Sequence, residues 1–200
     1  MRNIFFSSYL ANHKVGAHIK ANNYGIALAL WSDSKDFTYG ALRNVQLANI
    51  FLPKWKVRVF IPTNMSNRSE LAIKDNLLQK MRSLGADIVY VDMKIVNIPL
   101  NLINTLIFDE KQVTHFMIRD VRQRISGCDS QVTNDFITSD RSVRFVRYKD
   151  KHKNATILPQ MWEGNRKKMK ERLDGMTMKQ FIQVILNRLL KIQISCLNFL

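Results

Sequence analysis

The order of apolar segments is the feature that most limits the folds open to this 200-residue chain. Short runs rich in β-branched residues alternate with segments whose apolar residues recur at helical spacing. We expect strands in "YGIALALWSD", "WKVRVFIP", "ADIVYVD", "THFMIRD" and "SVRFVRY". Strands that alternate with helices predict βαβ units, and therefore a Rossmann-like, mainly parallel sheet flanked by helices.

The segments between the strands are expected to be helices with recognisable ends. Pro53 is a candidate stop for the first helix, because proline cannot continue one. Ser69 is a candidate N-cap and Gly85 a candidate C-terminal stop for the second. The expected helices are "TYGALRNVQLANIFLP", "SNRSELAIKDNLLQKMRSLG", "PLNLINTLIFDE" and "DSQVTNDFITSD".

The positive charge of the chain is concentrated in its C-terminal third. The formal net charge is +15, and residues 141–200 hold 14 Lys or Arg residues against 4 acids. Residues 1–140 are closer to balance, with 17 against 12. Clustered basic residues attract polyanions, so nucleic acid, an anionic membrane or a phosphorylated substrate are the partners that this charge favours.

Both ends of the chain differ from its centre. The apolar run at the N-terminus breaks at Ser7 and Ser8, so there is no clear signal peptide. The tail "FIQVILNRLLKIQISCLNFL" is too polar for a clear membrane span, and indicates a basic amphipathic helix. We expect an N-terminal extension over 1–20, an α/β domain over 21–175 and a helical tail over 176–200. The compartment does not follow from these segments.

Several enzyme classes lack their motifs here. The chain has no G-x-G-x-x-G, no phosphate loop of the G-x-x-x-x-G-K-[ST] type and no G-x-S-x-G elbow. Open parallel sheets bind ligands outside the carboxyl ends of their strands. Asp33, Asp92 and Asp120 each close an expected strand, so we expect these three carboxylates on one rim of the sheet.

Five ordered blocks carry a resemblance to a known family: "YGALRNVQLANIFLPKWKVRVFIP", "LGADIVYVD", "HFMIRDVRQRIS", "FVRYKDKH" and "ILPQMWEGNR". Over about residues 24–180 the chain resembles a poorly characterised family of eukaryotic glycosyltransferase-like proteins of the nucleotide-sugar (GT-A) type. The resemblance implies a nucleotide-diphospho-sugar bound across the sheet edge, an Asp-x-Asp motif that holds a divalent metal, and transfer to an acceptor. It ends near residue 180, which indicates a divergent or truncated C-terminus.

The family's R-D-x-D-x-R pattern falls on "RDVRQR". Arg119, Asp120 and Arg124 match it, and these three together with Arg122 would lie on the diphosphate side of the donor. Arg122 replaces the second carboxylate, which removes an oxygen ligand and adds a positive charge, so Mn²⁺ or Mg²⁺ should bind weakly if at all.

Three interpretations of this degenerate motif stay open. Asp120 could still bind a metal weakly, or contact a ribose or water. It could form a surface ion pair with Arg122 or Arg124. Alternatively, the two arginines could bind the diphosphate directly, because guanidinium groups contact phosphate oxygens bidentately without a metal ion.

The resemblance adds further candidates downstream and upstream. Arg147 and His152 would lie near the donor, with His152 as a phosphate donor, a metal ligand or a solvated loop residue. Trp162 is kept in a segment where Glu163 and others replace family glycines, and is a sugar platform or a core residue. We expect the first helix to open with Tyr39, Gly40, Arg43 and Asn44, whose free N–H groups would face a nucleotide; alternatively, these residues only serve the helix start. Asp33 would bind uracil or ribose, or cap its own turn.

Two functions follow from these observations. The first is a glycosyltransferase-like protein that binds a nucleotide-diphospho-sugar, with weakened or lost transfer to an unidentified acceptor. The alternative is a non-catalytic basic module that contacts RNA or an anionic membrane through the C-terminal third of the chain.

Overall fold

The computed structural model describes residues 23–65, 71–148 and 156–197, with the backbone alone for 147–148, 156–159 and 188–197. The extension predicted over 1–20 lies outside the described residues. Strands and helices alternate along the chain as expected. In order they are β1 (Tyr24–Ala29), α2 (Lys35–Phe51), β2 (Trp55–Thr63), α3 (Asp75–Ser83), β3 (Asp87–Asp92), α4 (Met93–Val96), the 3-10 helix η1 (Leu100–Asp109), β4 (His115–Arg119), α5 (Gly127–Thr138), β5 (Val143–Tyr148), β6 (Thr156–Asn165), α6 (Arg166–Arg172) and α7 (Met178–Leu197).

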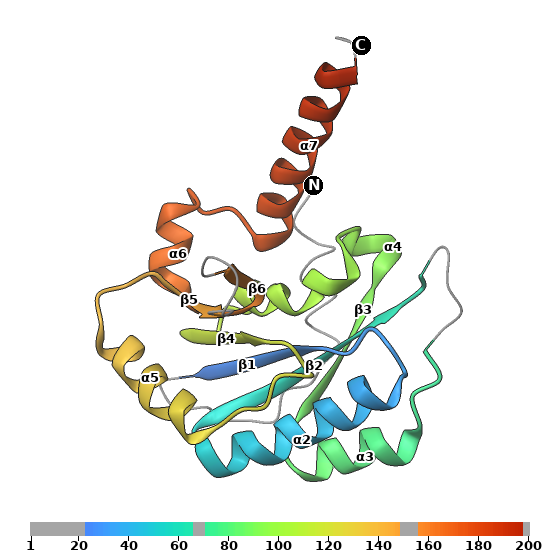
Figure 1. Ribbon diagram of the computed structural model, residues 1–200, viewed down its shortest axis with the longest axis vertical. Helices are drawn as coiled ribbons and strands as arrows, with labels where there is room; N and C mark the ends of the chain where they lie inside the picture. Colours follow the sequence, from blue (N-terminus) through green and yellow to red (C-terminus); the bar gives the residue numbers. More distant parts are fainter. Residues whose placement is uncertain (1–22, 66–70, 149–155, 198–200) are drawn as a thin grey trace.

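The strands form one six-stranded sheet in the order β3-β2-β1-β4-β6-β5 (Figure 1). Strands β1 to β4 pair in parallel, while β6 runs antiparallel to both β4 and β5. The prediction of a mainly parallel, Rossmann-like α/β sheet is therefore confirmed. Strand β6 was not among the expected strands, and it forms the join between the parallel part and the edge strand β5.

Each face of the sheet carries its own apolar core. On one face, Ile26 and Leu28 of β1 pack with Val45 of α2 and with residues of α3. On the other, Ala27 of β1 and Phe60 of β2 pack against η1 and the start of α7. A strand buried on both sides needs an unbroken apolar run, which explains why "YGIALAL" shows no alternation.

The helices expected after β2 and β3 differ from the sequence prediction. Helix α3 begins at Asp75, with Lys74 as its N-cap, so Ser69 is not the cap; Gly85, at φ +89°, does end it. The segment after Pro99 is a 3-10 helix rather than an α-helix. Over ten residues, apolar spacing does not separate a period of 3.0 from one of 3.6, so the sequence could not decide this point.

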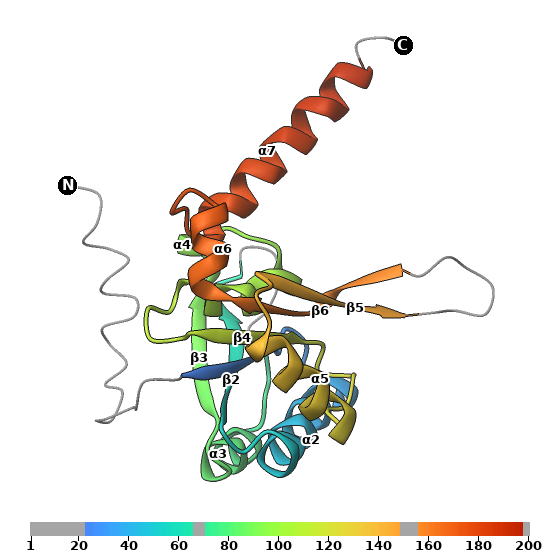
Figure 2. The same ribbon diagram turned by 90° about the vertical axis from the view of Figure 1, so that its left-hand side faces the viewer.

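The C-terminal part of the chain leaves the sheet in two directions (Figure 2). The β5–β6 hairpin reaches out sideways, and α7 rises away from the domain after its first turns. The helical tail is confirmed, whereas the domain boundaries at residues 21 and 176 stay predictions. Among the described residues, no helix combines the length and the hydropathy that crossing a bilayer requires.

Candidate functional site

The carboxyl ends of β1 and β4 lie side by side and define the candidate site. The two strands pair in parallel, with Leu28 level with Arg119, so Asp120 follows directly at the sheet edge. Asp33 lies exposed in the segment after β1. The third rim carboxylate, Asp92, belongs to β3, which β2 and β1 separate from β4.

Asp92 has a structural role on its own part of the rim. Its Oδ1 accepts a hydrogen bond from Lys94 N at 2.9 Å, which caps α4, and its Oδ2 accepts one from Asn64 Nδ2 at 2.8 Å. Both oxygens are therefore engaged locally. The candidate site is the part of the rim formed by β1, β4 and the start of α2.

Helix α2 holds the loop that follows Asp120. The buried side chain of Asn44 donates from Nδ2 to Val121 O at 2.9 Å and accepts from Ile125 N at 3.0 Å. Gly40 permits this close approach, because a Cβ there would lie 2.5 Å from Val121 O. Arg124 also donates to Val121 O, at 2.9 Å, so its guanidinium is partly used by its own loop.

Asp120 and Arg122 form a bidentate ion pair on that loop. Arg122 Nε lies 3.2 Å from Asp120 Oδ1 and Nη2 lies 2.9 Å from Oδ2, while Arg122 N adds a third bond to Oδ1 at 2.9 Å. The Asp120 side chain is 14% exposed and that of Arg122 is 56% exposed. The Arg122 guanidinium also lies over the ring of Phe37 on α2, 5.3 Å from its centroid. The pair thus connects the β4 loop to the first turn of α2.

The electrostatics of the pair favour the ionised forms of both groups. Burial alone would raise the pKa of Asp120, but the hydrogen bonds and the charge of Arg122 outweigh burial and hold this pKa below its ordinary value. The same contacts with Asp120 raise the pKa of Arg122. The cation that Asp120 binds in this structure is the guanidinium of Arg122.

This arrangement does not fit a divalent metal. A metal ion would need the carboxylate oxygens that Arg122 engages, and it would lie beside a fixed positive charge. The described residues also include no group of three or more His, Cys, Asp or Glu side chains that could hold a metal ion.

Arg119, predicted to lie beside the diphosphate, is engaged inside the protein. Its side chain is 2% exposed and pairs with Asp129 in the first turn of α5. Burial lowers the pKa of Arg119 to about 10. Asp129 also accepts hydrogen bonds at 2.8 Å from both N and Oγ of Ser126, so the pair fixes the start of α5.

Trp162 lies in the core, with 9% of its surface exposed. Its ring packs edge-on against Phe116 of β4, with 5.2 Å between the centroids, and it also contacts Phe145 of β5. This position supports the core interpretation of Trp162. The role as a sugar platform stays an untested prediction.

The helix-start residues and the downstream residues complete the predicted set. Because α2 begins at Lys35, the prediction that Tyr39 and Arg43 open the helix is wrong. Tyr39 is 60% exposed, and Arg43 donates to Gln46 Oε1 at 3.2 Å. Arg147 belongs to β5, with its side chain outside the description, and His152 lies outside the described residues.

Sequence reasoning missed a buried polar cluster between α5 and the antiparallel strands. Glu163 is 1% exposed; it accepts from Thr133 Oγ1 at 2.8 Å and from Arg144 Nε at 3.1 Å. The only sequence signal is an acid within the apolar segment "ILPQMWEGN". A lone acid in a buried strand requires a cationic partner, which lies 19 residues away in the sequence.

Comparisons with known proteins find likenesses among solved structures alone. Neither a protein-family model nor a curated protein matches the chain. The crystal structure of 4-diphosphocytidyl-2C-methyl-D-erythritol synthase from Anaerococcus prevotii is similar over 86% of each chain, with 9% identity and a TM-score of 0.43. A likeness of this size supports no conclusion about the site.

Proposed function

We propose that this chain is a glycosyltransferase-like protein that binds a nucleotide-diphospho-sugar at the carboxyl ends of β1 and β4, and that its metal-dependent transfer is weakened or lost. The observation that supports the proposal is the Asp120–Arg122 pair. It lies at the sheet edge where open α/β folds bind ligands, and the guanidinium stands where a second carboxylate would complete an Asp-x-Asp motif.

The chemistry of the pair favours donor binding without a metal ion. Two nitrogens of the Arg122 guanidinium contact Asp120, and more than half of the side chain stays exposed. A guanidinium held in this way can still present N–H donors to phosphate oxygens. Asp120 fixes the orientation of Arg122 but supplies no free carboxylate for a metal or for proton transfer. We therefore expect the protein to bind the donor while sugar transfer is weakened or lost.

Calorimetric titration with uridine and guanosine diphosphates and their sugar conjugates tests this proposal. Each titration is run with Mn²⁺ and with a chelator. We expect similar affinities under the two conditions, and weaker binding by the Arg122→Ala variant than by the Arg82→Ala variant, which loses an exposed arginine from the last turn of α3. Absence of binding in all titrations would rule out the donor site. Binding that requires Mn²⁺ would rule out the metal-independent role of Arg122.

A further inference from the structure

Within residues 178–187, the part of α7 whose side chains the structure describes, the helix is held to the domain mainly through its first turns, and Leu186 packs partly buried against the same core. Met178 and Ile182 are buried, at 4% and 7% exposure, in the core that η1 and β4 share. Asp109 Oδ1 accepts a hydrogen bond from Met178 N at 2.8 Å, and Lys179 Nζ donates to Ile95 O at 2.7 Å. Beyond these contacts the helix axis leads away from the sheet and its covering helices (Figures 1 and 2).

Aliphatic side chains are exposed where α7 leaves the domain. Val184 is 39% exposed and Ile185 is 40% exposed. Successive residues of an α-helix point about 100° apart, and Val184 follows the buried Ile182 by two positions, so it lies on the side away from the domain. The helix therefore carries apolar surface that its own domain does not cover.

The charge of α7 is of one sign. Its 20 residues include Lys179, Arg188 and Lys191 and no Asp or Glu. Exposed aliphatic residues combined with basic residues alone are typical of helices that lie at the surface of an anionic membrane.

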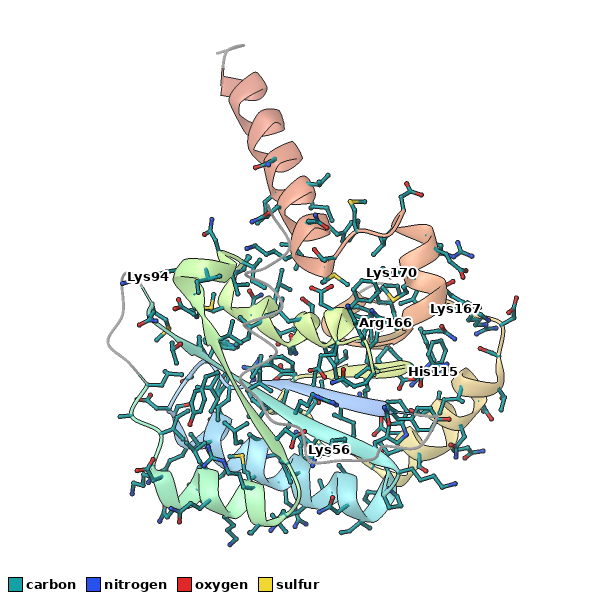
Figure 3. The ribbon with its side chains drawn as sticks, turned by 180° about the vertical axis from the view of Figure 1, so that it is seen from behind. Lys56, Lys94, His115, Arg166, Lys167 and Lys170 are labelled. Carbon is teal, nitrogen blue, oxygen red and sulfur yellow. The ribbon has the colours of Figure 1, made fainter. Side chains whose placement is uncertain are left out.

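Helix α6, next to the start of α7, adds exposed positive charge (Figure 3). Three of its basic residues have partners: Arg166 donates to Phe108 O at 2.8 Å, Arg172 donates to Ser142 Oγ at 2.7 Å, and Lys168 pairs with Asp140. Lys167 and Lys170 are exposed and form no ion pair with an acid in the part of the chain that the structure describes.

We propose that α6 and α7 together form a binding surface for an anionic lipid bilayer, with Val184 and Ile185 in the interface and Lys167 and Lys170 on the lipid headgroups. A second copy of the chain fits this surface less well, because two α7 helices would bring only like charges together. RNA fits less well too, because bases stack on aromatic or guanidinium planes and gain little from exposed Val or Ile.

Vesicle flotation with the full-length chain tests this inference independently of any nucleotide. Vesicles of phosphatidylcholine mixed with phosphatidylserine are compared with vesicles of phosphatidylcholine alone, at low and high salt. We expect binding to the mixed vesicles, at least about tenfold tighter than to the neutral ones, and loss of that advantage as salt screens the headgroups. Equal binding to both kinds of vesicle would overturn the role of the lysines.

Matched variants separate the two parts of the surface. We expect Val184→Asp with Ile185→Asp to weaken vesicle binding by about tenfold or more, while Ile50→Asp, at an aliphatic residue 65% exposed on α2, leaves it unchanged. Lys167→Glu with Lys170→Glu should weaken it by a similar factor, and Lys54→Glu should not. Circular dichroism confirms that each variant is folded.

Three results would overturn the proposal. The first is vesicle binding that both double variants retain. The second is concentration-dependent dimerisation of a protein that ignores vesicles, which would assign α7 to a second copy of the chain. The third is salt-sensitive binding of a single-stranded RNA that the same variants abolish, again without vesicle binding, which would assign the surface to nucleic acid.

Discussion

The side chain of Asn44 on α2 holds Val121 on the loop after β4, through a hydrogen bond of 2.9 Å from Nδ2 to the Val121 carbonyl. The same side chain accepts a bond from Ile125 N at 3.0 Å, so one fully buried amide fixes both ends of the turn that presents Arg122. Asn44, which lies 77 residues before Val121 in the chain, therefore helps to position Asp120 and Arg122.

Asn44→Ala should destabilise the protein strongly. The substitution leaves the N–H of Ile125 without its partner in a buried place, and removes one of the two bonds to Val121 O. We expect the free energy of unfolding to fall by about 2–3 kcal/mol. Asn49→Ala is the control, because the exposed Asn49 makes a single bond to Leu84 O and its loss should cost about 1 kcal/mol or less. Urea denaturation of the three proteins measures both values, and equal losses would show that the Asn44 bonds have no special weight.

Glu163→Ala should be similarly damaging. The substitution leaves the partly buried guanidinium of Arg144 without the carboxylate that it pairs with. It also leaves the hydroxyl of Thr133 without its hydrogen-bond acceptor. Removal of one partner of a buried ion pair typically costs about 3–5 kcal/mol, and the 19% exposure of Arg144 places the expected loss near the lower value. Asp140→Ala, which breaks the exposed pair with Lys168, should leave the melting temperature unchanged. A Glu163→Ala protein as stable as the natural one would mean that Arg144 reaches solvent when its partner is lost.

The strands could be predicted from the sequence because burial on both faces leaves an unbroken apolar run, as in Ile26–Leu30. The rim position of Asp120 followed from the same pattern, because it comes directly after such a run. The start of α2 was placed too late because Ser34 and Asp36, which mark a helix start, fell between the expected strand "YGIALALWSD" and the expected helix and were assigned to neither.

The features that the sequence did not predict depend on contacts with other segments of the chain. Strand β6 was not expected because Glu163 interrupts its apolar pattern, and the partners that make this acid tolerable come from α5 and β5. The direction of Arg119 toward Asp129 depends on how α5 packs, which no local pattern encodes. The pair of Asp120 with Arg122 was one of the three open interpretations, and the sequence alone could not choose among them because the choice depends on side-chain torsions.

Glu110 should make the stability of the protein depend on pH. It lies 6% exposed beside Arg58, with 2.7 Å between Oε2 and Nε, and burial raises the pKa of Glu110 to about 7 although Arg58 opposes the shift. Because this pKa is raised above the ordinary value of 4.5, the stabilising contribution is complete below pH 4.5 and is lost as the pH rises through about 7. We expect the free energy of unfolding to fall by up to about 3 kcal/mol over that window.

The Glu110→Gln protein provides the control for this pH dependence. Its amide does not titrate, so the difference between its unfolding free energy and that of the natural protein should change as the pH rises from 4.5 to about 7. Urea denaturation at a series of pH values measures the difference. A difference that stays constant would mean that Arg58 keeps Glu110 ionised throughout.

Arg122→Asp should restore a metal-binding pair at the end of β4. The substitution removes the cation that engages Asp120 and supplies a second carboxylate in Asp-x-Asp spacing, which is the ligand set that Mn²⁺ and Mg²⁺ prefer. If the proposed donor site is present, the variant should bind a nucleoside diphosphate at least about tenfold more tightly with Mn²⁺ than with a chelator, whereas the natural protein should show little difference. Isothermal titration calorimetry measures both affinities.

Arg124→Asp is the matched control for this gain, because it removes an exposed arginine from the same loop but places the new carboxylate outside Asp-x-Asp spacing. It should show no response to Mn²⁺. If Arg122→Asp also fails to respond, a second carboxylate alone cannot rebuild the site, and the obstacle lies in other residues around the rim. If the natural protein already responds strongly to Mn²⁺, the ion must displace the Arg122 guanidinium from Asp120. The Asp120–Arg122 ion pair would then be too weak to exclude a metal.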